Sequence, residues 1–355
     1  MESVEHLPGI ESRMVVTERI RTHLLTSGPL GGVPVIFLHG NLSSAAWFEE
    51  LMLVMPVRYT CYAADLRGYG ETEDLPIDAR RGARDTADDL RSLFTALQID
   101  AAHLAGWSAG AAAAMQFAID HPRAVASLTL IAPVSPYGFG GTRDVDGTPS
   151  TPDFAGSGAG TVNVEAVAEL RLGRVESDSP LSPLQLLRTV FVEPPARVAR
   201  EKTLVRAMLQ QKLGERRYPG DFVRSPHWPH VAPGVWGPIN ALSPKYFNAS
   251  SIADIPDKPP VLWIRGEADR IVSDHSLFDL AAAAGQDPAS GSAGFPPQPM
   301  VAQMREILRR YKSNGGRVEE VTMKATGHSP FLERPEEFLK AFCNFLRNGV
   351  AQGVL

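Results

Sequence analysis

Cysteine and positive charge are both scarce in this sequence. The 355 residues include only two cysteines, and the 35 lysines and arginines are outnumbered by 40 aspartates and glutamates. Cys61 and Cys343 fall in apolar strand-like and helix-like patterns, so we expect two inert, buried thiols. The formal net charge of -5 excludes the basic surface that binds nucleic acid or an anionic membrane. We therefore expect neither as a partner.

Long apolar runs are missing as well. No segment approaches the roughly 18 uncharged apolar residues of a membrane span. The N-terminal stretch MESVEHLPGIESRMVV has no basic start followed by an apolar run, so a cytoplasmic location is expected. There is no Cys/His cluster and no phosphate-binding glycine loop, and the sequence therefore predicts no metal ion and no organic cofactor.

Short apolar runs alternate with amphipathic stretches through much of the chain. Ala87, Leu90, Leu93 and Phe94 have helical spacing within residues 85–99, which predicts a helix covering one sheet face. This alternation favours a parallel sheet with helices on both faces. Two half-exposed antiparallel strands are expected within 13–28 and an edge strand within 316–327, and the expected buried strands are 33–40, 58–72, 101–107, 125–133 and 259–266.

One long region interrupts this alternation of apolar runs and amphipathic stretches. Residues 136–256 begin glycine-rich, continue with helical apolar spacing and end rich in proline and aromatic residues. We interpret them as a largely helical cap inserted between two sheet strands, with residues 1–135 and 257–355 forming the core. A second irregular stretch covers residues 285–300.

Ser108 lies at the junction of a predicted strand and a predicted helix. Gly106 and Gly110 flank it in the sequence GWSAG, where the absence of side chains lets strand and helix pass closely. A serine on such a turn is exposed at the positive end of the new helix. It is a candidate nucleophile that requires a base and an acid.

Candidates for both partners follow later strands of the predicted sheet. Asp269 lies in the loop after the strand at 260–265, and His328 follows the strand at 317–323. The order serine, aspartate, histidine fits catalytic loops at the carboxyl ends of parallel strands. Glu267 and Asp274 remain alternative acids, although Asp269 is favoured because it lies in the middle of its loop.

Two backbone amides are expected to stabilise a developing oxyanion. One belongs to Ala109, which follows the nucleophile at the helix start. The other is predicted from the loop after residues 33–38, at Asn41 or alternatively at Leu42. The Asn41 side chain either reaches the substrate or caps the next helix, and His39 is expected to brace this loop by hydrogen bonding.

These motifs together resemble the α/β-hydrolase fold family. The resemblance implies an eight-stranded, mostly parallel, doubly wound sheet, a cap after the sixth strand, and hydrolysis through an acyl-enzyme. Epoxide hydrolases and haloalkane dehalogenases of this fold carry an aspartate where this chain has Ser108, so the resemblance points to the esterases and lactonases. The segments that carry it are HGN at 39, DLRGYGET at 65, GWSAG at 106, RGEADRIV at 265 and GHSPFLERPEEF at 327.

The resulting hypothesis is a serine hydrolase acting on a small to medium apolar ester or lactone. Alternatives on the same site are a carbon-carbon bond hydrolase, a thioesterase, or a ligand receptor with slow turnover. We expect a monomer or homodimer. The residues predicted to line the substrate pocket are Trp107, Leu42, Trp228, Trp236 and Tyr218.

Overall fold

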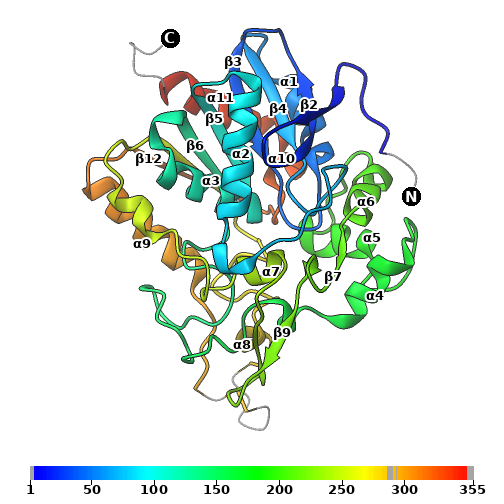
Figure 1. Cartoon of the computed structure of the whole chain (residues 1–355), viewed down its shortest axis with the longest axis vertical. Helices are drawn as coiled ribbons and strands as arrows, with labels where there is room; N and C mark the ends of the chain where they lie inside the picture. The colour runs from blue at the N-terminus through cyan, green and yellow to red at the C-terminus, as the bar shows by residue number, and fades with distance from the viewer. Residues whose placement is uncertain (1–3, 286–290, 293, 350–355) are drawn as a thin grey trace.

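The computed structural model describes residues 4–285, 291–292 and 294–349. Its centre is an eight-stranded sheet in the order β1-β2-β4-β3-β5-β6-β11-β12 (Figure 1). The strands from β4 to β12 run parallel, and β2 is antiparallel to both of its neighbours. This confirms the predicted fold class. The strands are β1 (Glu11–Val16), β2 (Arg21–Ser27), β3 (Val33–Leu38), β4 (Tyr59–Ala64), β5 (Ala102–Trp107), β6 (Val125–Ile131), β11 (Val261–Gly266) and β12 (Val318–Met323).

Burial follows the position of each strand in the sheet. Residues 35–38 of β3 and all of β5 are buried, as the apolar runs in their sequences predict for central parallel strands. The edge strands β1 and β12 are mostly exposed or half-buried, which confirms the alternating patterns at both ends. The polar side chains of β1 therefore face solvent at the sheet edge.

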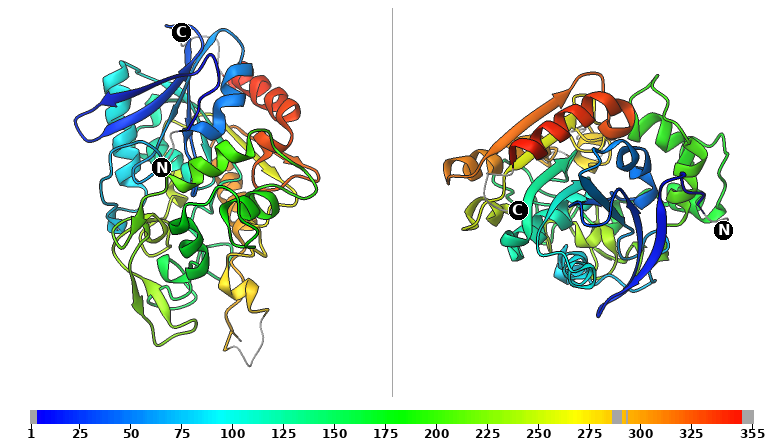
Figure 2. Two further views of the ribbon diagram at one scale, coloured as in Figure 1. Left: turned by 90° about the vertical axis from the view of Figure 1, so that its right-hand side faces the viewer. Right: turned by 90° about the horizontal axis from the view of Figure 1, so that it is seen from above.

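Helices cover both faces of the sheet. The α2 (Arg84–Leu97), α3 (Ala109–Asp120) and α9 (Met300–Ser313) helices share one hydrophobic cluster, whereas α1 (Glu49–Val54) and α11 (Pro335–Gly349) contribute to the other. Figure 2, right, shows α11 in red and α2 in cyan on opposite sides of the sheet. Within the described part of the chain, no helix has both the length and the apolar character needed to cross a membrane.

The segment between β6 and β11 contains short helices followed by short strand pairs. The strands β8, β9 and β10 fall where the sequence was predicted only as irregular, whereas β7 lies at the end of a stretch predicted to be helical. Prolines and glycines limit each strand there to two or three residues. The elements are η4 (Ala159–Thr161), α4 (Val164–Leu172), α5 (Pro183–Leu186), η5 (Leu187–Phe191), α6 (Glu201–Leu209), β7 (Leu213–Gly214), β8 (Tyr218–Pro219), β9 (Phe222–Arg224), β10 (Val231–Pro233), α7 (Pro238–Ala241) and η6 (Ser250–Asp254).

The predicted division at residues 136 and 256 stays a prediction. In the structure, η6 packs on α3 and α9 and its Ile252 belongs to the core cluster on that face. The chain therefore returns to the core packing before residue 256. The remaining short elements are α8 (Leu280–Ala283), α10 (Pro330–Glu333) and the turns η1 (Ala45–Phe48), η2 (Ala79–Arg81) and η3 (Pro122–Ala124).

The two irregular stretches of the sequence pack against each other. The Gln298 side chain accepts the Gly140 amide at 2.6 Å and donates to the Gly138 carbonyl at 3.1 Å. The ring of Trp228 lies 5.3 Å from that of Phe295. These contacts join the cap segment to the loop before α9, although residues 286–290 and 293 of that predicted stretch lie outside the described residues.

Candidate active site

Ser108 occupies a sharp turn between β5 and α3. Its φ of 54° lies in the left-handed region that residues other than glycine avoid. Its amide donates to the carbonyl of Ile131, the last residue of β6, at 2.9 Å. A strained residue fixed by neighbouring strands is typical of a functional turn. The turn holds a half-buried serine at the N-terminus of α3.

The two flanking glycines are required by backbone packing. A Cβ on Gly110 would lie 2.2 Å from the Leu38 carbonyl oxygen of β3. A Cβ on Gly106 would lie 2.7 Å from the Cα of Ala111 in α3. Both distances are far inside van der Waals contact with backbone atoms. The glycine spacing around Ser108 therefore reflects the close approach of α3 to the sheet.

Asp269 and His328 form a buried pair from the loops after β11 and β12. The Nδ1 atom of His328 lies 2.8 Å from Oδ2 of Asp269. The other carboxylate oxygen accepts the amides of Ile271 and Val272 at 2.8 and 3.0 Å. Because all of these contacts converge on one carboxylate, its position relative to the imidazole is fixed.

The two alternative acids lie elsewhere. Glu267 is exposed, and the Asp274 carboxylate accepts the amides of Val301 and Ala302 at the start of α9. Of the three carboxylates that the sequence leaves open, Asp269 is the one hydrogen-bonded to His328.

The second imidazole nitrogen of His328 has no protein partner among the described residues. Since Nδ1 faces a carboxylate, it carries the proton, and Nε2 presents its lone pair. This atom is fully buried and makes no hydrogen bond, including none to Ser108. Buried polar atoms without partners are rare and mark sites that engage a ligand or a mobile group. Catalytic hydrogen bonds are also often long before substrate binds.

Trp107 connects the histidine loop to the turn that carries Ser108. Its indole Nε1 donates to the backbone carbonyl of His328 at 2.8 Å, and the two rings lie 5.4 Å apart. Because Trp107 directly precedes Ser108, this bond holds the imidazole loop beside the turn. Phe191 of the cap contacts both rings, with its own ring 6.0 Å from the imidazole and 6.0 Å from the indole.

The loop after β3 passes directly against Ser108. A Cβ on Gly40 would lie 3.0 Å from that of Ser108, so the following amides of Asn41 and Leu42 belong to the same site. Leu42 is 8% exposed and has a φ of 51°. Ala109 is the first residue of α3, and its amide is among those that receive no partner within the helix. Which loop amide acts as a donor stays a prediction.

The Asn41 side chain makes a contact that the sequence did not indicate. Its Oδ1 accepts the hydroxyl of Tyr69 at 2.9 Å, whereas the following helical turn is capped by Ser44. Burial raises the pKa of Tyr218, and a hydrogen bond with the Asn41 side chain opposes that rise. Tyr69 from the core and Tyr218 from the cap therefore meet at Asn41, in the loop after β3.

His39 braces this loop, as predicted. Its Nδ1 lies 2.8 Å from the Gly40 carbonyl, and its Nε2 accepts the Leu66 amide at 2.9 Å. Burial lowers the pKa of His39, which keeps the ring neutral and Nε2 available as an acceptor. The histidine thus joins the loop after β3 to the loop after β4.

The predicted pocket residues separate into two groups. Trp107, Leu42 and Tyr218 are all buried, with Trp107 against the His328 ring and Tyr218 bonded to the Asn41 side chain. Trp228 instead packs on Phe295, and the Arg216 guanidinium lies 3.8 Å from the ring centre of Trp236. These last two side chains have partners within the cap and the adjoining loop.

Glu333 is a site residue that sequence reasoning missed. Its carboxylate accepts the amides of Gly327 and Ser329, which flank His328, and the amide of Glu193 in the cap at 2.9 Å. Burial raises the pKa of Glu333. The sequence feature that could have indicated this role is the position of Glu333, six residues after Gly327 and at the end of the helical turn that begins with Ser329 and Pro330. Glu333 links the cap to the histidine loop.

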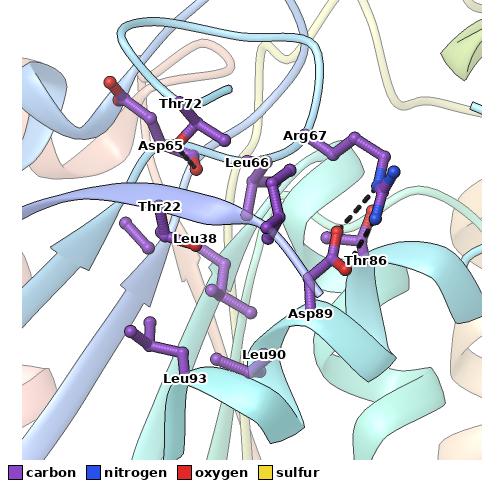
Figure 3. Close-up of a pocket in the computed structure, with 12 residues that line it drawn as sticks. Thr22, Leu38, Asp65, Leu66, Arg67, Thr72, Thr86, Asp89, Leu90 and Leu93 are labelled. Carbon is purple, nitrogen blue, oxygen red and sulfur yellow. Dashed lines mark hydrogen bonds and ion pairs between the residues drawn. The ribbon is translucent and has the colours of Figure 1, made fainter. Parts of the chain in front are cut away.

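A small cavity lies beside α2, and Ser108, Asp269 and His328 are not among the residues that line it. It is lined in part by Asp65 and Leu38, and the Arg67 guanidinium forms two hydrogen bonds of 2.7 Å with Asp89 beside it (Figure 3). Its volume of about 20 Å³ has room for roughly one water molecule. An ester substrate does not fit there. No group of three or more metal-ligating side chains occurs within the described ranges.

Comparison with known proteins places this site in a family. The model described as the alpha/beta hydrolase family matches residues 35–341. The chain belongs to the alpha/beta hydrolase family.

Its relatives catalyse several reactions. Carboxylesterase YbfK of Bacillus subtilis (strain 168) is 30% identical over 128 residues, which cover 36% of this chain and 43% of the relative. A fluoroacetate dehalogenase of Burkholderia sp. is 29% identical over 132 residues, again covering 36% of this chain and 43% of the relative. The matched stretches thus span less than half the length of either relative.

Solved structures share the fold of this alpha/beta hydrolase over nearly its whole length. Carboxylesterase CesB (YbfK) from Bacillus subtilis has a TM-score of 0.59 at 19% identity, covering 96% of this chain and 93% of that one. The 2-hydroxy-6-oxo-6-phenylhexa-2,4-dienoate hydrolase from Rhodococcus sp. strain RHA1 has a TM-score of 0.60 at 16% identity, covering 95% and 99%. At these identities the likeness shows the fold alone.

Proposed function

We propose that this protein is a serine hydrolase that cleaves a carboxylic ester or lactone through an acyl-enzyme. The observation that carries the proposal is the buried Asp269–His328 pair, whose unpartnered Nε2 belongs to the same loop cluster as Ser108. The carboxylesterases among the relatives support esters as the substrate class. The substrate would be a small to medium molecule, mainly apolar.

In the first step, Nε2 of His328 takes the proton of Ser108 while Oγ attacks the carbonyl carbon. The Oγ–C bond forms, the alcohol leaves with the proton from His328, and the acyl group remains on Ser108. Asp269 holds the imidazole in the tautomer that this step needs and stabilises its charged form. Closure of the site around substrate would bring Ser108 and His328 into hydrogen-bonding distance.

The oxyanion of the tetrahedral intermediate would be held by the amides of Ala109 and Asn41, with Leu42 as the alternative loop donor. Each well-placed donor contributes roughly 2.7 to 4 kcal/mol to transition-state stabilisation. Water then attacks the acyl-enzyme with His328 as the base, and the acid product leaves. No step requires a metal ion or an organic cofactor.

The pocket would lie between the loops of the core and the cap. Trp107, Leu42 and Tyr218 are buried and would supply much of its lining. Phe191 brings a cap side chain onto the imidazole itself. Cap position would therefore decide which acyl or alcohol group reaches Ser108.

The decisive experiment combines turnover with mapping of the covalent intermediate. Purified wild-type protein is incubated with p-nitrophenyl butyrate, a simple lactone and a vinylogous diketone, and quenched samples are digested and analysed by mass spectrometry. We expect multiple turnovers with an ester or lactone and a transient acyl group on Ser108. Ser108→Ala should remove both, whereas the exposed control Ser313→Ala should keep both.

Three outcomes would contradict the proposal. Full turnover in Ser108→Ala would exclude the serine as nucleophile. Cleavage of the diketone alone would indicate a carbon-carbon bond hydrolase. A single stoichiometric burst with the acyl group retained would indicate a receptor rather than an enzyme.

A further inference from the structure

A second serine, histidine and aspartate lie in hydrogen-bonded order at the β1 edge of the sheet. The Oγ atom of Ser12 is 2.8 Å from Nε2 of His23, and Nδ1 of His23 is 2.7 Å from Oδ2 of Asp65. Ser12 belongs to the edge strand β1, His23 to β2, and Asp65 to the loop after β4. We propose that Ser12 is a second acyl-acceptor site, modified by activated acyl compounds such as aryl esters.

The aspartate is fixed as firmly as the one in the proposed active site. Asp65 is 2% exposed, and its carboxylate accepts the Ala45 amide at 2.7 Å and the Glu71 amide at 2.8 Å in addition to His23. Burial by itself would raise the pKa of Asp65, but the hydrogen bond and charge of His23 outweigh it and lower the pKa. The carboxylate is therefore ionised at neutral pH and directs the Nδ1 proton of His23 toward itself.

The side chain of His23 is also held in place by its surroundings. Its backbone amide donates to the hydroxyl of Thr72 at 2.9 Å, and its ring stacks on that of His6 with 5.9 Å between centroids. His23 is 4% exposed, so the ring has little freedom to turn. With Nδ1 bonded to Asp65, neutral His23 has its lone pair on Nε2, where it accepts the Ser12 hydroxyl.

Ser12 itself is open to solvent. It lies on the outer strand of the sheet, next to β2 on one side only, and is among the exposed residues of β1. An electrophile in solution can therefore reach its Oγ. The arrangement combines an accessible hydroxyl with a base already in contact, which is the requirement for an activated nucleophile.

The expected reaction is a single acyl transfer. His23 takes the proton of Ser12 as Oγ bonds to the carbonyl carbon of a p-nitrophenyl ester; the carbon–oxygen bond to p-nitrophenolate breaks, and the proton passes to solvent. Ser12 lies inside a strand, so it lacks the helix-terminal amides that follow Ser108. Without a helix start beside the serine to stabilise the oxyanion, only good leaving groups should react, and the acyl group should be retained.

The pH dependence follows from the groups around His23. Burial lowers its pKa, but the hydrogen bond and charge of Asp65, with a smaller effect of Glu71, outweigh burial and raise it. The remaining ionisable neighbours are His6, stacked on the ring, and Glu49, which pairs with His6 at 2.7 Å. Because only the neutral ring accepts the Ser12 proton, acylation should become faster as the pH rises through the pKa of His23.

The test uses the full-length Ser108→Ala variant, so that its result does not depend on the proposed active site. This variant is incubated with p-nitrophenyl acetate, and acetylation at each serine is followed over time by peptide mass spectrometry. We expect Ser12 to react at least about 10-fold faster than the exposed serines Ser251 and Ser313. Adding His23→Gln should reduce the acetylation rate at Ser12 to that of Ser251 and Ser313, because a glutamine amide can still donate a hydrogen bond to Asp65 but cannot take the proton of Ser12.

Two results would overturn the inference. One is acetylation of Ser12 at the rate of Ser251 and Ser313. The other is an unchanged Ser12 rate in the His23→Gln background when circular dichroism shows that the fold is intact. Should that variant fail to fold, a Ser12 rate that does not rise between pH 5.5 and pH 8.5 relative to Ser313 would contradict it instead.

Discussion

The molecule contains two clusters of a serine, a histidine and an aspartate, and they differ in the backbone that carries the serine. The distance between histidine and aspartate is nearly equal, 2.8 Å for His328 with Asp269 and 2.7 Å for His23 with Asp65. Ser108, however, lies on a strained turn at a helix N-terminus, whereas Ser12 lies in an extended edge strand.

The comparison separates two requirements of acyl transfer. A base and its orienting acid are present in both places, and at Ser12 the base already contacts the hydroxyl. The amides proposed to stabilise an oxyanion come from the start of α3 and from the loop after β3, which both adjoin Ser108. A Cβ built on Gly40 of that loop would lie 3.0 Å from the Cβ of Ser108. Ser12 has neither element beside it in its edge strand. We therefore expect turnover at Ser108 and at most one slow modification at Ser12.

The largest expected effect comes from removing each serine in turn. Ser108→Ala should lower kcat by roughly 10⁴- to 10⁶-fold, since nucleophile, base and oxyanion donors act as a unit. Ser12→Ala should leave ester turnover within about twofold, because Ser12 lies in the exposed edge strand β1 and its hydroxyl bonds to His23 rather than to His328. Steady-state kinetics with p-nitrophenyl butyrate measures both, and comparable losses in the two variants would refute the distinction.

Removing the charge of each aspartate should separate catalysis from stability. Both carboxylates are buried and make three hydrogen bonds, so Asp269→Asn and Asp65→Asn should each lower the free energy of unfolding by roughly 3 kcal/mol. Asp269→Asn should in addition lower kcat by about 10⁴-fold, because the amide favours the wrong imidazole tautomer. Urea unfolding and kinetics on both variants test this, and an equal loss of kcat in Asp65→Asn would contradict it.

Glu333→Gln should have an intermediate effect on the proposed reaction. The carboxylate fixes the backbone on both sides of His328, and a neutral amide holds it less firmly. We expect kcat to fall about 10-fold with KM and Tm nearly unchanged, in the range seen for residues that orient catalytic groups. Glu337→Gln, an exposed residue of α11, is the control. A fall in Tm with unchanged kcat would instead assign Glu333 a structural role alone.

The smallest expected effect concerns the pH dependence of stability at His23. Asp65 raises the pKa of His23 above its ordinary 6.5 in the folded protein. This interaction is therefore fully stabilising below pH 6.5 and is lost as the pH rises through the folded pKa. The stability difference between wild type and His23→Gln, measured by urea unfolding, should be larger at pH 5.5 than at pH 8.5. An equal or larger difference at pH 8.5 would contradict the sign.

The sequence predicted the parts of the fold that depend on local pattern. The turn at Ser108, and the loops of Asp269 and His328, follow from strand ends in a parallel sheet, where catalytic loops share one edge. The cluster around Ser12 was not predicted, because it depends on the register between β1 and β2 and on the fold of the loop after β4. Register of this kind is set by pairing across the sheet rather than by neighbouring residues.

The cap was the least predictable region. Trp228 and Trp236 were assigned to the pocket because their surroundings lack regular spacing, yet the structure gives them Phe295 and Arg216 as partners. Phe191, whose ring lies 6.0 Å from the imidazole of His328, was not singled out. Long irregular segments pack through contacts between distant residues, and such contacts leave no periodic signal in the sequence.

The ratio of acylation rates at the two serines in one sample of wild-type protein distinguishes turnover at Ser108 from a single modification at Ser12. A low concentration of p-nitrophenyl acetate is mixed rapidly with the protein, and the acetylated peptides containing Ser108 and Ser12 are quantified at successive times by mass spectrometry. We expect acetylation of Ser108 to be at least about 10³-fold faster than that of Ser12, and to be transient at Ser108 alone. Equal rates, or faster acetylation of Ser12, would show that the backbone around Ser108 gives it no advantage.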